Sequence, residues 1–258
     1  MDTTLLKGLD VLEALCKSSS PRGVSELARE LGLTKSNLHR TLQTLVRAGY
    51  VRGALVAGTY ECSLKLFELA SGIVARLDVR QSADVYMQQL ASLTKETIHL
   101  SVLDGWDVIY LNKIESLHPV RAYSSIGGRA PAHCVASGKA LLAWQGENFL
   151  QQLPTTLVAP TARSLSTREA LFVELAKVRR QGFATNRGEW RDGVGGVAAI
   201  VFDVAGTPVA SLGISGPLER MRPAAIRKHS QLVVDAAIGL SGALGYSAQN
   251  HYPPVVAA

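Results

Sequence analysis

Two short amphipathic helices joined by a glycine turn restrict the fold of this chain more than any other feature. Ser25 is placed to cap a helix over residues 26–31, and Gly32 follows as a chain-reversing glycine does. Thr34 is the next candidate N-cap, and the helix behind it ends at Gly49. Its apolar positions recur at helical spacing: Leu38, Leu42, Leu45 and Val46. A short helix, a turn and a longer helix form the helix-turn-helix layout.

The flanking segments complete a small N-terminal domain over residues 1–63. Residues 4–17 place leucines on one helical stripe, at positions Leu5, Leu9, Leu12 and Leu15. Residues 50–63 change to a strand pattern in which Gly53 and Gly58 bracket the turn of a two-stranded wing. A further stripe predicts a linker helix over residues 64–78 that buries its face against another subunit: Leu66, Leu69, Ile73 and Leu77. Burial against its own chain is the alternative.

The second domain is expected over residues 79–250. Strands are predicted over 97–103, 106–114, 119–124, 183–186, 197–204 and 208–215. Helices are predicted around Val85, Leu90 and Leu93, over 135–144, from a Ser166/Glu169 capping box to Gln181, and from Pro223 to Leu244. Helices interleaved with hairpins favour an antiparallel sheet flanked by helices, hence an α+β class. Residues 251–258 are expected to fray.

Positive charge is concentrated in the first domain. The net charge of the whole chain is +6, whereas the 36 residues from Lys17 to Arg52 carry seven basic and two acidic residues, a local net of +5. Phosphate contacts require such a basic block. A solvated helix face is the alternative explanation of the charge alone.

The polar side of the second helix carries candidate DNA contacts. Arg40 is suited to a guanine edge or a phosphate, Asn37 and Gln43 to adenine, and Ser36 and Thr41 to phosphate. The full set on this helix is Lys35, Ser36, Asn37, His39, Arg40, Thr41 and Gln43. Arg22 and Arg52 are further candidates for phosphate or minor-groove contacts. An ordinary amphipathic helix with a wet side is the alternative.

Composition excludes several classes of protein. With 47% hydrophobic and 19% charged residues, the chain can bury a core, so global disorder is excluded. No apolar run reaches the length of a membrane span, and the first residues lack a signal-peptide pattern. The three cysteines, Cys16, Cys62 and Cys134, form no CxxC and cannot all pair. This indicates a reducing cytoplasm without a disulfide framework.

Several segments partly match enzyme or cofactor-binding motifs, but the neighbouring residues do not fit those motifs. Residues 193–198 match a loose dinucleotide pattern but lead into a strand, whereas the fingerprint requires a helix there. Residues 137–139 resemble the end of a phosphate loop without its first glycine, and residues 213–217 lack the last glycine of a nucleophile elbow. The six histidines show no metal-ligand spacing. His99 is either a satisfied inner-face histidine or a pocket donor. We expect no enzyme activity, no cofactor and no metal.

Several motifs in order carry a resemblance over about 240 residues. They are the helix-turn-helix segment, the stretch GGRAPAHCVASGKALLA, and NRGEWRDGVGGVAAIVFD followed by VASLGISGP. With these the chain resembles IclR-family transcriptional regulators. The resemblance implies a winged helix-turn-helix that dimerises through helical contacts, a linker helix and a GAF/profilin-like effector domain. It implies a homodimer or homotetramer that binds palindromic promoter DNA and responds to a small organic acid, carboxylic or aromatic.

The resemblance also implies an effector pocket. Matching the family motifs assigns to it Ala136, Ser137, Asn186, Glu189, Trp190, Val194, Gly196, Gly213 and Ser215. Trp190 stands where a histidine is frequent in the family, and Gly188 where an acid is, so the class of ligand is left open. Arg129, Arg187 and Arg191 flank the set. Two alternatives remain: a small-molecule binding module without a regulatory role, and a DNA-binding protein whose second domain only oligomerises.

Overall fold

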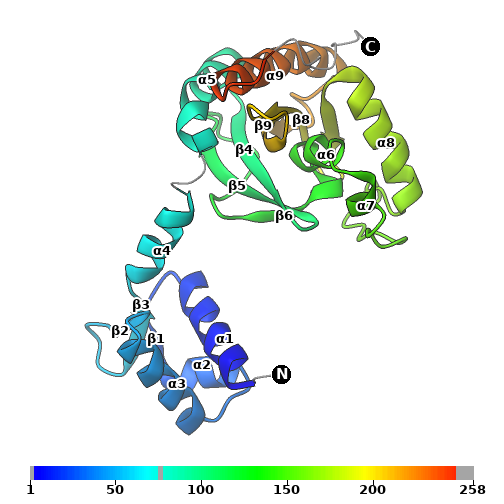
Figure 1. Cartoon of the computed structure of the whole chain (residues 1–258). Helices are drawn as coiled ribbons and strands as arrows, with labels where there is room; N and C mark the ends of the chain where they lie inside the picture. Colours follow the sequence, from blue (N-terminus) through cyan, green and yellow to red (C-terminus); the bar gives the residue numbers. More distant parts are fainter. Residues whose placement is uncertain (1–2, 75–77, 248–258) are drawn as a thin grey trace. The chain divides into compact units, whose positions relative to one another are not determined.

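Three helices and a small sheet form the N-terminal unit, Met1–Arg76, of this computed structural model, which describes residues 3–74 and 78–247 (Figure 1). The helices are α1 (Thr3–Lys17), α2 (Val24–Glu30) and α3 (Lys35–Arg47), and α4 (Lys65–Val74) follows the sheet. The strands are β1 (Arg22–Gly23), β2 (Val51–Gly53) and β3 (Thr59–Cys62). The winged helix-turn-helix is therefore confirmed as the fold of this unit.

The turn between α2 and α3 forms for the reasons that the sequence suggests. Gly32 has a φ of +64°, a left-handed conformation that glycine adopts at no steric cost. Thr34 caps α3, since its side-chain oxygen accepts a hydrogen bond from the Asn37 amide at 3.3 Å. Leu38 and Leu42 are fully buried in the core of the unit. Ser25 was the wrong cap for α2, because the helix begins at Val24 and places Ser25 inside the first turn.

Two features of this unit differ from the sequence predictions. The buried face of α1 carries Val11, Ala14 and Leu15, because this face packs against α3 and β3, whereas Leu9 of the predicted stripe is exposed. The wing has three strands in the order β1-β3-β2. Strand β1 is only two residues long, too short for a periodicity to reveal it.

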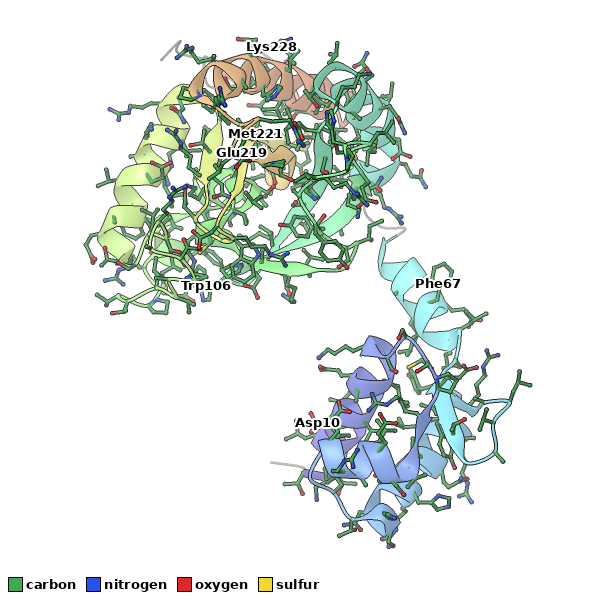
Figure 2. The ribbon with its side chains drawn as sticks, turned by 180° about the vertical axis from the view of Figure 1, so that it is seen from behind. Asp10, Phe67, Trp106, Glu219, Met221 and Lys228 are labelled. Carbon is green, nitrogen blue, oxygen red and sulfur yellow. The ribbon has the colours of Figure 1, made fainter. Side chains whose placement is uncertain are left out.

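Helix α4 carries exposed apolar side chains. Phe67 is 70% exposed and projects from the helix surface in Figure 2, and Leu69 is also exposed, while Leu66 is half-buried. Of the predicted linker stripe, Leu77 and the side chain of Ile73 lie outside the described residues, as does the tail 251–258. The burial of this stripe against another subunit therefore stays a prediction.

A six-stranded antiparallel sheet in the order β6-β5-β4-β9-β8-β7 organises the second unit, Leu77–Ala258. Its strands are β4 (Thr97–Asp104), β5 (Asp107–Ile114), β6 (Arg129–Pro131), β7 (Ala184–Arg187), β8 (Val194–Phe202) and β9 (Pro208–Pro217). Its helices are α5 (Asp78–Thr94), α6 (Ala136–Leu142), α7 (Glu147–Leu150), α8 (Arg168–Gln181) and α9 (Pro223–Ala243). The predicted α+β class is confirmed.

Helices cover both faces of this sheet (Figure 1). Val197, Ala199 and Val201 of β8 face α5 and α9, while the alternate residues Ala198 and Ile200 face α6 and α8. This period of two is what a strand buried on both faces requires. On the α6 face, the two halves of the sheet and the helix enclose the space that is described below. None of the helices in residues 3–74 and 78–247 has the length and apolarity to cross a membrane.

Two predictions in this unit were wrong, and one was confirmed. Residues 119–124 form no strand; the third strand of that side is β6, and the intervening segment is held by side-chain contacts. The helix predicted around Val85, Leu90 and Leu93 is confirmed as α5. Its buried face runs through Ala83, Met87 and Leu90, and Val85 and Leu93 are exposed. Helix α8 is capped by Thr167, which accepts from the Ala170 amide at 3.2 Å, and not by a box built on Ser166.

Candidate nucleic-acid interface and ligand cavity

The N-terminal half of α3 presents a row of polar side chains to solvent. Leu38 and Leu42 anchor the opposite side of the helix in the core. Thr41 is half-buried, and its hydroxyl donates to the Asn37 carbonyl at 3.1 Å within the helix. The exposed residues of the predicted set are Lys35, Ser36, Asn37, His39, Arg40 and Gln43. The helix thus offers amide, imidazole and cationic groups of the kinds that contact base edges and phosphates.

The basic residues around α3 differ in their availability. Lys35 and Arg40 form no ion pair with any residue of the described ranges 3–74 and 78–247. Arg52 on the wing pairs with Glu61 across β2 and β3 at 2.8 Å, and its side chain remains 64% exposed. These three cations can approach a polyanion.

Arg22, the remaining predicted DNA contact, is already engaged in two ion pairs. Its guanidinium lies 2.5 Å from Glu30 and 2.9 Å from Glu26, and its side chain is only 17% exposed. The hydrogen bonds that the guanidinium donates to the carboxylates of Glu30 and Glu26 raise the pKa of Arg22 above its usual value. Arg22 therefore joins β1 to α2, which leaves little of its charge for a phosphate.

The wing is linked to α3 through Tyr60. Gln43 donates from its side-chain amide to the Tyr60 hydroxyl at 3.4 Å. Tyr60 belongs to β3, and Gly53 is its partner in β2. The contact connects the exposed side of α3 with β3, the central strand of the wing.

In the second unit, a cavity of about 110 Å³ lies on the α6 face of the sheet. Strands β4, β7, β8 and β9, helix α6 and the segments before β6 and after β7 all contribute to its wall. Eight of the nine predicted pocket residues line it: Ala136, Ser137, Asn186, Trp190, Val194, Gly196, Gly213 and Ser215. Segments distant in the sequence therefore meet at one place. That a ligand binds there stays a prediction.

Two glycines allow close packing in the wall of this cavity. A Cβ at Gly213 would lie 2.8 Å from the Ser137 hydroxyl, and one at Gly196 would lie 2.8 Å from the Ile214 carbonyl. Both distances are shorter than a Cβ tolerates. The wall can therefore be this close to the sheet only where strand residues lack a side chain.

A buried histidine organises the polar side of the cavity. The Nε2 atom of His99 lies 2.6 Å from the Ser124 hydroxyl, and its Nδ1 lies 3.3 Å from the Ser215 hydroxyl. The ring is 4.7 Å from that of Tyr110. Burial, with a smaller contribution from Lys113, lowers the pKa of His99 to about 4. His99 is thus a neutral cavity residue that is already hydrogen-bonded, so it combines both interpretations open from the sequence.

Stability should depend on pH through His99. Its folded pKa of about 4 lies below the unfolded value, so the unfolded state binds more protons as the pH falls. We expect the free energy of unfolding to fall by about 1 kcal/mol between pH 6.5 and pH 5.5 from this group. The test is urea unfolding of the wild type and His99→Asn across this range. An equal decrease in both proteins would contradict the assignment.

Positive charge lies at the cavity wall. Arg129 is paired with Asp104 and, at 3.7 Å, with Asp107. Arg191 also lines the cavity, and it forms no ion pair with a residue of the described ranges. Burial raises the pKa of the Tyr110 hydroxyl, and the charge of Arg191 partly opposes this shift. Arg191 is therefore the cation of this wall that is available to an anion.

Glu189, the ninth predicted pocket residue, is not part of the wall. Its two carboxylate oxygens accept from the Lys139 ammonium at 2.7 and 2.9 Å, and both residues are buried. Its backbone amide donates to Asn186 at 2.9 Å, and its carboxylate accepts from the Arg187 amide at 3.3 Å. Glu189 therefore holds the turn that carries Trp190 rather than facing the cavity.

Sequence reasoning missed part of the wall. The segment before β6 contributes residues without any periodic pattern, and Tyr110 lies on a strand whose inner face the sequence did not assign. The missed residues are Tyr110, Ala122, Tyr123, Ser124, Ser125, Gly128, Val135, Val197 and Ile214. His99, Arg129 and Arg191 were noticed but left out of the predicted set. The described part of the chain contains no group of three or more metal-ligating side chains.

Comparisons with known proteins agree with this geometry. Residues 4–54 match the IclR helix-turn-helix domain and residues 71–242 match the bacterial transcriptional regulator IclR C-terminal domain. The chain is 35% identical over 246 residues to the HTH-type transcriptional regulator KdgR of Escherichia coli K12, covering 95% of this chain and 93% of KdgR.

Two solved structures are also similar. The IclR of Thermotoga maritima superimposes with a TM-score of 0.79 at 28% identity, covering 95% of this chain and all of that one. An IclR homolog from Microbacterium hydrocarbonoxydans, solved in complex with 4-hydroxybenzoate, superimposes with a TM-score of 0.79 at 25% identity and covers 94% of this chain and 99% of its own.

Proposed function

This chain belongs to the IclR family, whose members are DNA-binding transcriptional regulators with an effector-binding C-terminal domain, and on that premise we propose its specific mode of action. It acts in the cytoplasm as a homodimer or homotetramer, binds a palindromic operator through α3 and the wing, and senses a small organic acid in the cavity beside α6. The domain boundaries proposed are 1–63, 64–78 and 79–250. The family consists of regulators rather than enzymes.

The observation that carries the DNA-binding part is the exposed polar row of α3 with its unpaired cations. Lys35 and Arg40 face solvent without a carboxylate partner in the described residues, so binding a phosphate or a base costs no broken ion pair. Direct readout in the major groove needs a helix that is anchored on one side and polar on the other. Leu38 and Leu42 supply that anchor.

Exposed apolar side chains support self-association. Leu9 on α1 and Phe67 and Leu69 on α4 are exposed within the N-terminal unit. Apolar side chains of this size at helix surfaces are typical of interfaces between subunits. A two-fold dimer presents two copies of α3, and a palindromic operator has the matching symmetry.

The cavity supports an anionic effector of small size. Its volume of about 110 Å³ is below the ~150 Å³ of an engineered cavity that admits benzene. A short-chain acid therefore fits the cavity better than a large acid does. The Ser137 hydroxyl and the Asn186 side chain can donate to a carboxylate, and Arg191 supplies charge. The 4-hydroxybenzoate complex of the Microbacterium homolog is consistent with an acid as the effector. An aromatic acid is the larger of the two kinds of effector that we propose.

Coupling between the sites follows from population shift. An effector that binds one arrangement of the oligomer more tightly raises the population of that arrangement and changes operator affinity with it. Helix α4 is the last element of the N-terminal unit and directly precedes the C-terminal unit in the sequence, so we expect its packing to differ between the arrangements. Whether the operator affinity rises or falls decides between activation and repression at a given promoter.

The direct test is a mobility shift of the purified protein on its own upstream intergenic DNA. We expect a specific shift that one member of a panel of short-chain and aromatic acids alters. A specific shift that no acid alters would remove the sensor part of the proposal. The absence of any shift beyond that on scrambled DNA would contradict the DNA-binding part.

Filling the cavity should abolish the response and leave DNA binding intact. A Val side chain at position 213 must occupy the space next to the Ser137 hydroxyl, since even a Cβ there lies at 2.8 Å. We expect Gly213→Val to weaken the response to the active acid by at least about tenfold, the effect of one or two misplaced methyl groups. Gly146→Ala is the matched control, because nothing lies within 4 Å of its added Cβ. Effector titrations followed by mobility shift measure the change.

The positive charge of Arg191 should increase the affinity for an anionic ligand and leave the affinity for a neutral one unchanged. A charge-assisted hydrogen bond contributes about 1.5–3 kcal/mol, so Arg191→Gln should weaken binding of the active acid by roughly tenfold or more. The neutral amide of the same acid should bind both proteins equally. Arg187→Gln is the control, since Arg187 is an exposed arginine of the same turn region that does not line the cavity. Isothermal titration distinguishes these cases, and equal losses for acid and amide would contradict the role of Arg191.

A further inference from the structure

Cys16 and Cys62 are 46 residues apart in the sequence, and their sulfur atoms lie 3.1 Å apart in the N-terminal unit. Cys16 belongs to the last turn of α1, and Cys62 is the last residue of β3. Both are free thiols. The separation is about 1 Å longer than the ~2.05 Å of a disulfide bond, so a small shift of one side chain would close it. The sequence alone predicts no disulfide framework and does not indicate that these two cysteines meet.

The environments of the two thiols differ. Cys16 is exposed at the end of its helix, whereas Cys62 is half-buried, with its sulfur 3.9 Å from the Leu12 carbonyl. Burial and the neighbouring Cys16 raise the pKa of Cys62 to about 12. Cys16 is therefore the thiol that a dissolved oxidant reaches first, and Cys62 is the partner held beside it.

We propose that Cys16 and Cys62 form a reversible intramolecular disulfide in response to hydroperoxides. In the first step, the Cys16 thiol loses its proton and the thiolate attacks a peroxide oxygen, so that the O–O bond breaks and Cys16 becomes a sulfenic acid. The departing hydroxide or alkoxide takes up that proton and leaves as water or an alcohol. In the second step, the Cys62 sulfur attacks the sulfenic sulfur, the S–O bond breaks, and a second water leaves as the disulfide forms. The two thiols are oxidised by two electrons and the peroxide is reduced by two.

This bond would stabilise the DNA-binding unit. Cys62 pairs with Val51 in the wing and directly precedes the segment that leads into α4, while Cys16 lies in the last turn of α1. A crosslink between them fixes α1 to the wing and closes a long loop of chain. Loops of this length lose much of their conformational freedom in the unfolded state when they are crosslinked. The oxidised unit should therefore open less often.

The test uses the full-length protein and stoichiometric hydrogen peroxide. We expect the number of thiols that alkylate after unfolding to fall from the three free cysteines to one, and the intact mass to fall by two hydrogens, with dithiothreitol reversing both. Hydrogen exchange of the amides in α1 and β3 should slow by at least about tenfold in the oxidised protein. Cys134 should remain alkylatable, since it is buried and its pKa is raised to about 11.

Single variants identify the pair. Cys16→Ser and Cys62→Ser should each prevent the loss of two hydrogens, whereas Cys134→Ser should leave it intact. Three results would overturn the proposal: peroxide that consumes no thiol, disulfide-linked dimers on a non-reducing gel, or a Cys16 sulfinic acid formed while Cys62 still alkylates. Serine differs from cysteine by one atom, so each variant should keep the circular dichroism of the wild type, and this measurement checks that it is folded.

Discussion

Replacing Lys139 by Met is expected to lower the free energy of unfolding of the C-terminal unit by about 3–5 kcal/mol, the cost of leaving one partner of a buried ion pair alone. Lys139 is 1% exposed on α6, and its ammonium binds both oxygens of Glu189. Glu174 lies 3.6 Å away and adds a second, longer contact. Without Lys139, the Glu189 carboxylate would remain buried and would keep one backbone hydrogen bond, from the Arg187 amide.

The same change should also weaken the effector response in the protein that remains folded. Glu189 accepts from the Arg187 amide, and its own amide is held by Asn186. These bonds shape the turn that carries Trp190 and Arg191, both of which line the cavity. A loss of stability and a loss of ligand affinity should therefore appear together.

Urea unfolding of three variants measures the effect and separates its causes. Lys177→Met is the matched control, because Lys177 is exposed on α8 and forms no ion pair in the described residues, so its loss should change stability by less than about 0.5 kcal/mol. The double variant Lys139→Met/Glu189→Leu removes both charges and should recover much of the lost stability. A decrease below 1 kcal/mol for Lys139→Met would contradict the role of the pair.

The pair also marks the limit of what this sequence predicts. Local signals succeed where one segment determines its own structure: Thr34 caps α3, and Leu38 and Leu42 face the core as the periodicity indicates. Lys139 and Glu189 are 50 residues apart, and nothing in either segment indicates that they meet. Such contacts depend on how α6 packs on the sheet, which periodicity does not determine.

The cavity shows the same division. Ser137, Gly196 and Gly213 were reached through the family resemblance, because they lie in motifs. The segment between β5 and β6 was predicted as a strand, yet it is held by the contact of Ser124 with His99 rather than by a ladder. Its side chains therefore entered the wall of the cavity without a sequence signal. The conformation of this segment depends on side-chain contacts with distant segments. These contacts form only in the folded protein, so the local sequence does not predict them.

Arg40→Ala should cost about 1–3 kcal/mol of operator binding, a loss of roughly 5- to 150-fold, if Arg40 reads a base. Arg40 is exposed on the polar side of α3, in the second turn of the helix, and pairs with no carboxylate of the described residues. Its guanidinium can therefore make the two parallel hydrogen bonds that guanine accepts in the major groove. This change removes a contact from each subunit of a dimer, so the effect per operator should lie toward the upper end of that range.

The sequence dependence of the loss identifies the kind of contact. A base contact should be lost on the operator and hardly at all on non-specific DNA, so the ratio of the two affinities should fall. A phosphate contact should instead weaken both alike and lower the slope of log affinity against log salt by about one. Arg180→Ala is the charge-matched control, since Arg180 is exposed on α8 in the other unit. Operator affinity of Arg40→Ala within a factor of about two of the wild type would exclude both roles, because either contact contributes more than that.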